Sequence, residues 1–217
     1  MAGLAALVIG ALALRTRGFF FLMVTLAFAQ MVFFLFHDTD IAGGDDGVFV
    51  ARPILGVEGF ALETTKKTRP LVGYYLNLAL LGAMYLALAW LLRSLFGRVL
   101  TGIRINEHRM RALGFDTYRY KLLAFVIAGA LAGVAGHQWV MNDGFVNPEL
   151  VGWHRSAEAL LMILVGGLGF LYGPILGAVA LTALGEVSQL ITDRQLLVQG
   201  LFILAIVLVL PQGLAGI

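Results

Sequence analysis

The chain has 217 residues, of which 60% are hydrophobic and only 13% are charged, against roughly 25% charged in soluble proteins. At roughly 20 residues per helical crossing, this apolar content allows about six membrane spans at most and excludes a sizeable soluble domain. The formal net charge of +2 says little about partners. The absence of cysteine excludes disulfides, thiolate metal ligands and a cysteine nucleophile.

Nearly all charged residues lie between long uncharged stretches of the chain. These stretches cover residues 1–14, 18–36, 70–92, 122–142, 159–185 and 195–217. A helix of about 20 apolar residues crosses a hydrocarbon core of about 30 Å and satisfies its own backbone hydrogen bonds. The sequence therefore predicts an all-α, polytopic membrane helix bundle of about five to six spans, with the charged segments as loops.

The first stretch, residues 1–14, is too short for a comfortable crossing. It also lacks the positively charged region that precedes the apolar core of a secretory signal. Two explanations stay open: a partial, interfacial crossing, or the end of a span whose earlier part lies upstream of the given chain.

The distribution of Lys and Arg predicts the orientation, because these residues are retained on the cytoplasmic side. Residues 93–121 are rich in them and are expected inside, with Arg15 and Arg17. Residues 37–70 are then outside and hold the acids Asp38, Asp40, Asp45, Asp46, Glu58 and Glu63. Three basic residues at the end of that outer segment oppose the assignment: Lys66, Lys67 and Arg69.

Residues 93–121 are expected to be structured as helix, stop, helix. Apolar residues of the first helix fall on one side: Ile103, Met110 and Leu113. Gly114 suits the position after a helix end, and Asp116 or Thr117 suits the cap of the next helix. The basic residues alone would only fix topology, but a short amphipathic element with a glycine stop favours a docking surface for a cytoplasmic partner.

The span that follows carries small residues at four-residue spacing, which lets helices approach closely. Gly129 and Gly133 are one such set, and Ala128, Ala132 and Gly136 are another. We expect Gly129, Gly133 and Gly136 to pack on a neighbouring helix. Polar side chains at membrane depth are few: Gln30, Asn77, His137, Gln138 and Asn142. Asn77 and Gln30 are expected to form interhelical hydrogen bonds, and none of these side chains is assigned to a solute.

Residues 159–185 would form one helix of about 40 Å, which overshoots the hydrocarbon core by roughly 10 Å. Five residues that weaken a helix interrupt it: Gly166, Gly167, Gly169, Gly173 and Pro174. We therefore expect a broken span of two half-helices, with Gly173 at a cap and Pro174 in the first turn of the second.

Two interpretations of this break stay open, and they are compatible. A discontinuous helix at membrane depth marks a translocation path, because its free backbone groups must be buried in protein or line a cavity. Alternatively, Gly169, Gly173 and Gly177 form a stripe at four-residue spacing for close helix packing.

Catalytic and nucleotide-binding motifs are missing from the sequence. No lysine follows a glycine, so a Walker A motif is absent. No serine lies in a Gly-x-Ser-x-Gly elbow. We expect no catalytic residue, metal ligand, cofactor or nucleic-acid partner, and no enzymatic activity.

Several segments, in chain order, resemble branched-chain amino acid ABC transporter permeases of the LivM type. The matching segments are Arg17–Gln30, Gly43–Gly47, Arg104–Phe125, Ala128–Gly136, Gly144–Glu149, Gly152–Glu158, Leu164–Ala178 and Leu210–Leu214. The resemblance implies a bacterial inner-membrane subunit for branched-chain amino acids or related small amino acid or amide solutes. It also implies three kinds of partner in the bilayer and beside it: a second homologous permease subunit, cytoplasmic ABC ATPase subunits that hydrolyse ATP, and a periplasmic solute-binding protein.

The resemblance further implies one transmembrane permease domain over residues 1–217, truncated at its N-terminus because family chains carry earlier spans. Glu107 and Gly114 match the acidic and glycine positions of the permease loop that docks on the ATPase. The residues expected to act in coupling are Arg104, Glu107, Arg109, Gly114 and Arg119. His108, Arg109 and Arg111 make the loop more basic than is usual in the family.

Two other function classes stay open from the residues alone. The broken span is also compatible with a self-sufficient secondary carrier or channel, which needs no partner. A membrane assembly subunit without a path of its own is the third hypothesis.

Overall fold

A computed structural model describes residues 1–16, 18–39, 43–49, 69–191, 195–210 and 213–216. Six residues used in the orientation argument lie outside the described residues: Arg17, Asp40, Glu58, Glu63, Lys66 and Lys67. The chain divides into two compact units, Met1–Leu150 and Val151–Ile217. That the two units form one permease domain stays a prediction.

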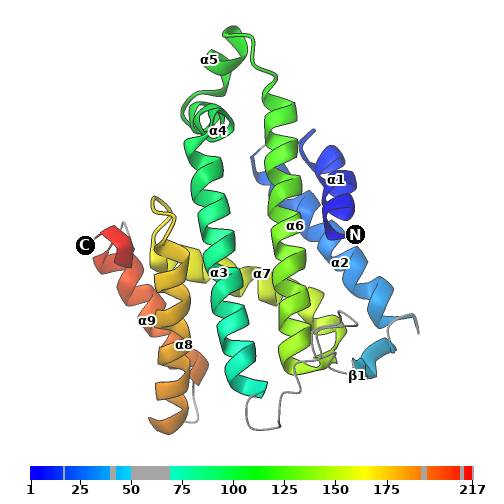
Figure 1. The fold of residues 1–217 in the computed structure, drawn as a ribbon, viewed down its shortest axis with the longest axis vertical. Helices are drawn as coiled ribbons and strands as arrows, with labels where there is room; N and C mark the ends of the chain where they lie inside the picture. The colour runs from blue at the N-terminus through cyan, green and yellow to red at the C-terminus, as the bar shows by residue number, and fades with distance from the viewer. Residues whose placement is uncertain (17, 40–42, 50–68, 192–194, 211–212, 217) are drawn as a thin grey trace. The chain divides into compact units, whose positions relative to one another are not determined.

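The predicted all-α membrane architecture is confirmed, and the chain is a multi-pass membrane protein. Among the described residues, three helices are long and apolar enough to cross a membrane: α2 (Phe19–His37), α3 (Arg69–Arg93) and α6 (Thr117–Asp143) (Figure 1). They coincide with three of the uncharged stretches. The number of crossings in the whole chain stays a prediction.

The short first helix, α1 (Ala2–Ala13), packs antiparallel on α6 through small residues. A Cβ added at Gly129 would lie 2.4 Å from the Cβ of Ala6, and one added at Gly133 would lie 2.3 Å from the Cβ of Ala2. The two helices therefore touch at their backbones, which is the mode of packing that small residues permit in membranes. The 12 residues of α1 extend over about 18 Å.

The contact with α1 involves Gly129 and Gly133 of the three predicted packing glycines. Among the described residues, no atom lies within 4 Å of the position of a Cβ at Gly136, so its packing on a neighbouring helix stays a prediction.

Two contacts fix which helix ends lie together in the first unit. The hydroxyl of Tyr118, at the start of α6, donates to the carbonyl of Ala11 near the end of α1 (2.9 Å). At the opposite end of α6, β2 (Phe145–Val146) pairs antiparallel with β1 (Val48–Phe49), which follows α2. The loops after α2 and α6 thus share one end, as the charge pattern predicts. Which end faces the cytoplasm stays a prediction.

A polar contact joins the two long helices α3 and α6. The side-chain amide of Gln138 donates to Oδ1 of Asn77 (2.5 Å). The expected interhelical role of Asn77 is therefore confirmed, and a hydrogen bond of this kind contributes roughly 0.6 kcal/mol on average in membrane proteins.

The second unit consists of α7 (Trp153–Gly166), α8 (Gly173–Ile191) and α9 (Gln195–Val209) around a core of Val165, Leu181 and Ile206. The predicted break between Gly166 and Gly173 is confirmed. The two helices do not continue in one line, however, because α7 and α8 pack against each other antiparallel.

The uncharged stretch 195–217 was expected to be a full crossing, and the structure differs. The helix α9 has 15 residues, about 22 Å, and ends at Val209. Pro211 follows closely in the sequence, and a proline cannot donate the backbone hydrogen bond that would continue the helix. Gly213 then takes a positive φ of 75°, and a short 3-10 turn covers Leu214–Gly216.

Candidate functional site

The segment between α3 and α6 folds into two short helices, α4 (Leu95–Ile105) and α5 (Glu107–Ala112), at one end of the two long helices (Figure 1). The turn from α3 into α4 needs a glycine, because a Cβ at Gly97 would lie 2.2 Å from the carbonyl oxygen of Leu92. Val99 and Ile103 form the buried side of α4.

A break at Asn106, which is absent from the helices predicted from the sequence, separates α4 from α5. Asn106 has extended backbone angles (φ −155°, ψ 100°), and its Oδ1 accepts the backbone N–H of Arg109 (3.0 Å). An asparagine followed by an acidic residue is a favourable helix start, which is the signal that could have revealed the break.

The prediction that Ile103, Met110 and Leu113 fall on one side of a helix is wrong because of this break. Ile103 is buried, and Met110 lies against Gly102. Leu113 is 70% exposed instead. The two helices have separate faces, so one helical periodicity cannot run through both.

The end of α5 has the geometry that the sequence predicts at Gly114. Gly114 takes a positive φ of 87°. The N–H of Gly114 donates to Arg111 (2.9 Å) and the N–H of Phe115 donates to Met110 (3.1 Å), which together form a Schellman motif. Asp116 then caps α6 by accepting the N–H of Arg119 (3.3 Å). The chain reverses within four residues and brings α5 back to the first turns of α6.

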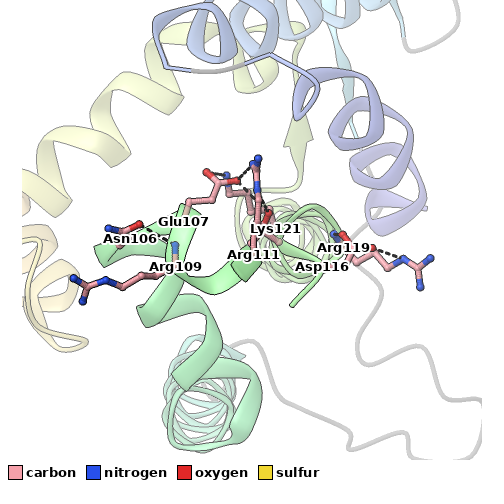
Figure 2. Close-up of polar contacts among 8 residues, drawn as sticks. Asn106, Glu107, Arg109, Arg111, Asp116, Arg119 and Lys121 are labelled. Atoms are coloured by element: carbon pink, nitrogen blue, oxygen red, sulfur yellow. Dashed lines mark hydrogen bonds and ion pairs between the residues drawn. The ribbon is translucent and has the colours of Figure 1, made fainter. Parts of the chain in front are cut away.

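A cluster of four side chains, the Glu107 cluster, joins α5 to α6. It consists of Glu107, Arg111, Thr117 and Lys121. The Nζ of Lys121 lies 2.6 Å from one carboxylate oxygen of Glu107. The other carboxylate oxygen pairs with Arg111 and accepts the hydroxyl of Thr117 (3.2 Å). Figure 2 shows the three charged groups converging from both helices.

Thr117 is the buried centre of the Glu107 cluster, with only 4% of its surface exposed. Its hydroxyl donates to Glu107 and accepts from Nε of Arg111 (3.1 Å). The ion pairs and hydrogen bonds lower the pKa of Glu107 from 4.5 to about 2, chiefly through the hydrogen bond from Lys121; partial burial opposes this, and Arg111 and Thr117 lower it further.

The Glu107 contacts are therefore expected to be insensitive to pH between 5 and 8. The pKa of Glu107 in the folded protein, about 2, lies below its ordinary value of 4.5. The contacts therefore stabilise the folded state fully above about pH 4.5, and this stabilisation is lost as the pH falls through about 2. The carboxylate is 29% exposed, so solvent screens it, and its contribution to the free energy of unfolding is on the order of 1 kcal/mol.

A carbon NMR titration of glutamate-labelled protein in detergent measures this pKa. The Glu107 carboxyl signal is assigned by its absence in Glu107→Gln. A titration midpoint for Glu107 at or above its ordinary value would show that the cluster does not form.

The three arginines expected in coupling lie outside the Glu107 cluster. Arg119 pairs with Asp116 of its own helix (Nε to Oδ2, 2.9 Å) and is 80% exposed. The guanidinium of Arg109 extends away from the Glu107 cluster (Figure 2). Arg104, at the end of α4, is exposed. The structure thus groups Glu107 with three residues outside the predicted coupling set, namely Arg111, Thr117 and Lys121.

The exposed side of α4 and α5 combines positive charge with two large apolar side chains. Ile105 is 79% exposed and Leu113 is 70% exposed. Arg104 and Arg109 are exposed on the same pair of helices. These four exposed residues of the two helices, counting Leu113 at the C-cap of α5, are together called the α4–α5 face. Within the described residues, no group of three or more His, Asp and Glu side chains is arranged to hold a metal ion.

In the second unit, the break between α7 and α8 is lined by buried glycines. A Cβ at Gly166 would lie 1.8 Å from the carbonyl oxygen of Gly173. A Cβ at Gly177 would lie 1.8 Å from the carbonyl oxygen of Met162. Backbone packs directly on backbone here, so no side chain larger than hydrogen fits at either position.

Gly213, after α9, also belongs to this contact and is not among the residues predicted from the sequence. A Cβ at Gly213 would lie 2.6 Å from the Cα of Gly167. The hydroxyl of Tyr172 donates to the carbonyl of Ala215 (3.2 Å). The loop between α7 and α8 therefore packs on the segment that follows α9.

Gly169 does not belong to the packing stripe that was considered with Gly173 and Gly177. It lies in the loop before α8 and is exposed, and no atom of the described residues lies within 4 Å of a Cβ placed there. The four-residue spacing cannot bring Gly169 to the same face because the helix begins only at Gly173. Pro174 lies in the first turn of α8, as predicted.

Residues 1–210 match a protein family described as branched-chain amino acid transport system / permease component. The high-affinity branched-chain amino acid transport system permease protein LivM of Escherichia coli strain K12 is 31% identical over 99% of this chain and 55% of its own length. LivM of Salmonella typhimurium strain LT2 is 32% identical over 97% of the chain and 54% of its own length.

The autoinducer 2 import system permease protein LsrC of Klebsiella pneumoniae is 38% identical over 50% of the chain and 33% of its own length. No solved structure matches the chain. The chain spans about half the length of the two LivM proteins that it matches. The match to the family runs through both compact units, and the chain belongs to the branched-chain amino acid transport system permease component family.

Proposed function

We propose that the chain is a transmembrane permease subunit of an ATP-binding-cassette importer in the bacterial inner membrane. The observation that carries this proposal is the folded α4–α5 element between two membrane-spanning helices, in the segment richest in Lys and Arg. A loop that only connects α3 to α6 has no need of two capped helices, whereas a docking surface does. Membership of the permease family and the names of the LivM relatives support the same function.

The solutes are branched-chain amino acids or related small amino acids and amides. The partners are cytoplasmic ABC ATPase subunits, a second homologous permease subunit and a periplasmic solute-binding protein. ATP hydrolysis belongs to the ATPase subunits, so this chain is not itself an enzyme.

The α4–α5 face is the surface proposed to meet the ATPase. Leu113 and Ile105 supply exposed apolar area, and Arg104 and Arg109 supply positive charge. Such a surface fits an apolar groove with an acidic rim, because apolar anchors contribute most of the affinity and complementary charges set orientation.

The translocation path is proposed beside the break in the second unit, at Gly166, Gly167, Gly169, Gly173 and Pro174. Non-helical backbone at membrane depth is tolerated only where protein buries it or where it lines a cavity. The loop at Gly169 is exposed, whereas Gly166 and Gly173 are closely packed against backbone. In this proposal the exposed loop forms one side of the path and the packed glycines form the other.

Copurification and reconstitution test this function. The tagged chain, isolated in mild detergent from its own host, is expected to bring ATPase subunits identified by mass spectrometry. Vesicles that contain this complex are expected to take up labelled leucine only with ATP and the solute-binding protein present.

Uptake of leucine by the single chain, driven by an ion gradient without ATP, would instead establish a secondary carrier or channel. Transport of autoinducer 2 by the ATPase complex, with no leucine uptake, would keep the subunit role and change the solute. The similarity to LsrC is the reason to include this compound in the assay.

A further inference from the structure

The carboxylate of Glu107 is engaged inside the chain rather than presented to the outside. Both of its oxygens have partners: one contacts Lys121, and the other contacts Arg111 and Thr117. A carboxylate that binds two cations and a hydroxyl has little capacity left for a docking protein.

The geometry of the Glu107 cluster links two helices by two pairs of residues. Glu107 and Arg111 are four residues apart on α5, and Thr117 and Lys121 are four residues apart on α6. Residues at this spacing lie on one face of a helix. One face of α5 is therefore bonded to one face of the first two turns of α6.

Apolar contacts support the same arrangement. The rings of Phe96 on α4 and Tyr120 on α6 stack with centroids 5.7 Å apart, and Phe115 meets the edge of Tyr120 at 6.1 Å. Met110 of α5 lies against Gly102 of α4. The elements α4, α5 and the start of α6 thus contact one another pairwise.

We propose that Glu107 is a positioning residue that fixes α5 to α6, so that a displacement of α5 by the ATPase moves α6 with it. This inference rests on the proposed function. In it, the α4–α5 face contacts the ATPase, and Glu107 transmits the movement without contacting the ATPase itself. Arg109 and Leu113 lie outside the cluster and are available to the partner.

A charge exchange tests the role of the pair. Glu107→Gln removes the charge, and the double variant Glu107→Lys with Lys121→Glu restores an ion pair of opposite direction. Glu158→Gln is the matched control, because Glu158 also pairs with an arginine of its own helix, Arg155, on α7. Each variant is compared for ATPase copurification, ATP hydrolysis and leucine uptake in the reconstituted complex.

Glu107→Gln is expected to retain the ATPase but to lose at least tenfold in leucine transported per ATP hydrolysed. The double variant is expected to recover to within threefold of the original chain, and Glu158→Gln to remain unchanged. Loss of the ATPase from the Glu107→Gln complex would show that Glu107 is a docking contact. Unchanged transport per ATP in Glu107→Gln, or no recovery in the double variant, would also overturn the proposal.

A distance measurement tests the link between α5 and α6 without depending on leucine uptake. The chain has no cysteine, so nitroxides at Leu113→Cys and Leu123→Cys, both exposed positions, report the separation of α5 and α6. Glu107→Gln is expected to broaden this distance distribution and the double variant to narrow it again. An original chain that binds no ATPase would refute the proposed function, whereas the nitroxide distances alone decide whether Glu107 holds the helices together.

Discussion

Gly177→Ala is expected to destabilise the second unit by more than about 3 kcal/mol, although it adds a single methyl group. The added Cβ would lie 1.8 Å from the carbonyl oxygen of Met162 and 2.8 Å from the backbone nitrogen of Gly166. Both contacts are to backbone, so no side chain can rotate away. The antiparallel pair of α7 and α8 must separate, which opens the core around Val165 and Leu181.

The thermal denaturation of the purified protein in detergent measures this effect. Gly200→Ala in α9 is the matched control, because a Cβ at Gly200 meets no atom of the described residues within 4 Å. Alanine is the better helix former by about 1 kcal/mol, so the control is expected to be neutral or slightly stabilising. Equal melting temperatures for the two variants would refute the backbone contact between α7 and α8.

Gly114→Val is expected to abolish ATP-driven uptake while the protein still inserts into the membrane. Gly114 has a φ of 87°, and a residue with a Cβ pays roughly 1–2 kcal/mol in this region, more when it is β-branched. A Cβ at Gly114 meets no atom within 4 Å in the part of the chain that the structure describes, so the expected effect comes from the backbone conformation. Relief of the strain would unwind the Schellman motif and release α5 from the start of α6.

Three substitutions at Gly114 that differ in their tolerance of positive φ show whether the loss of uptake follows the backbone strain or follows any replacement of the glycine. Asparagine tolerates positive φ best among residues with side chains, so Gly114→Asn is expected to retain most uptake and Gly114→Ala an intermediate amount. Uptake of labelled leucine by the reconstituted complex gives the order of activity, and immunoblotting of membranes gives the amount inserted. Full uptake by Gly114→Val would remove the end of α5 from the coupling mechanism.

Local signals in the sequence predicted the long helices and several helix ends, although not the break at Asn106 or the end of α9 at Val209. Uncharged stretches of about 20 residues predicted α2, α3 and α6, because only a helix satisfies the backbone in lipid. Gly114 and Asp116 predicted a helix end and a helix start, since each depends on side chains within a few residues. Pro174 marked the first turn of α8 for the same reason.

Contacts between distant residues could not be predicted in this way. Lys121 meets Glu107 only because the chain reverses at Gly114, and nothing in the spacing of 14 residues specifies that approach. Gly213 meets Gly167 across 46 positions of sequence, through the packing of α9.

Because α6 is long, a small tilt at one of its ends would displace its other end by several ångströms. Its 27 residues extend about 40 Å from the Glu107 cluster to the β2 strand. A rigid rod of this length converts a tilt of about 5° at one end into a displacement of roughly 3.5 Å at the other. Since β2 is hydrogen-bonded to β1, the segment after α2 would share that displacement. A small movement at the Glu107 cluster would therefore shift both the loop after α2 and the loop after α6, at the other end of α6.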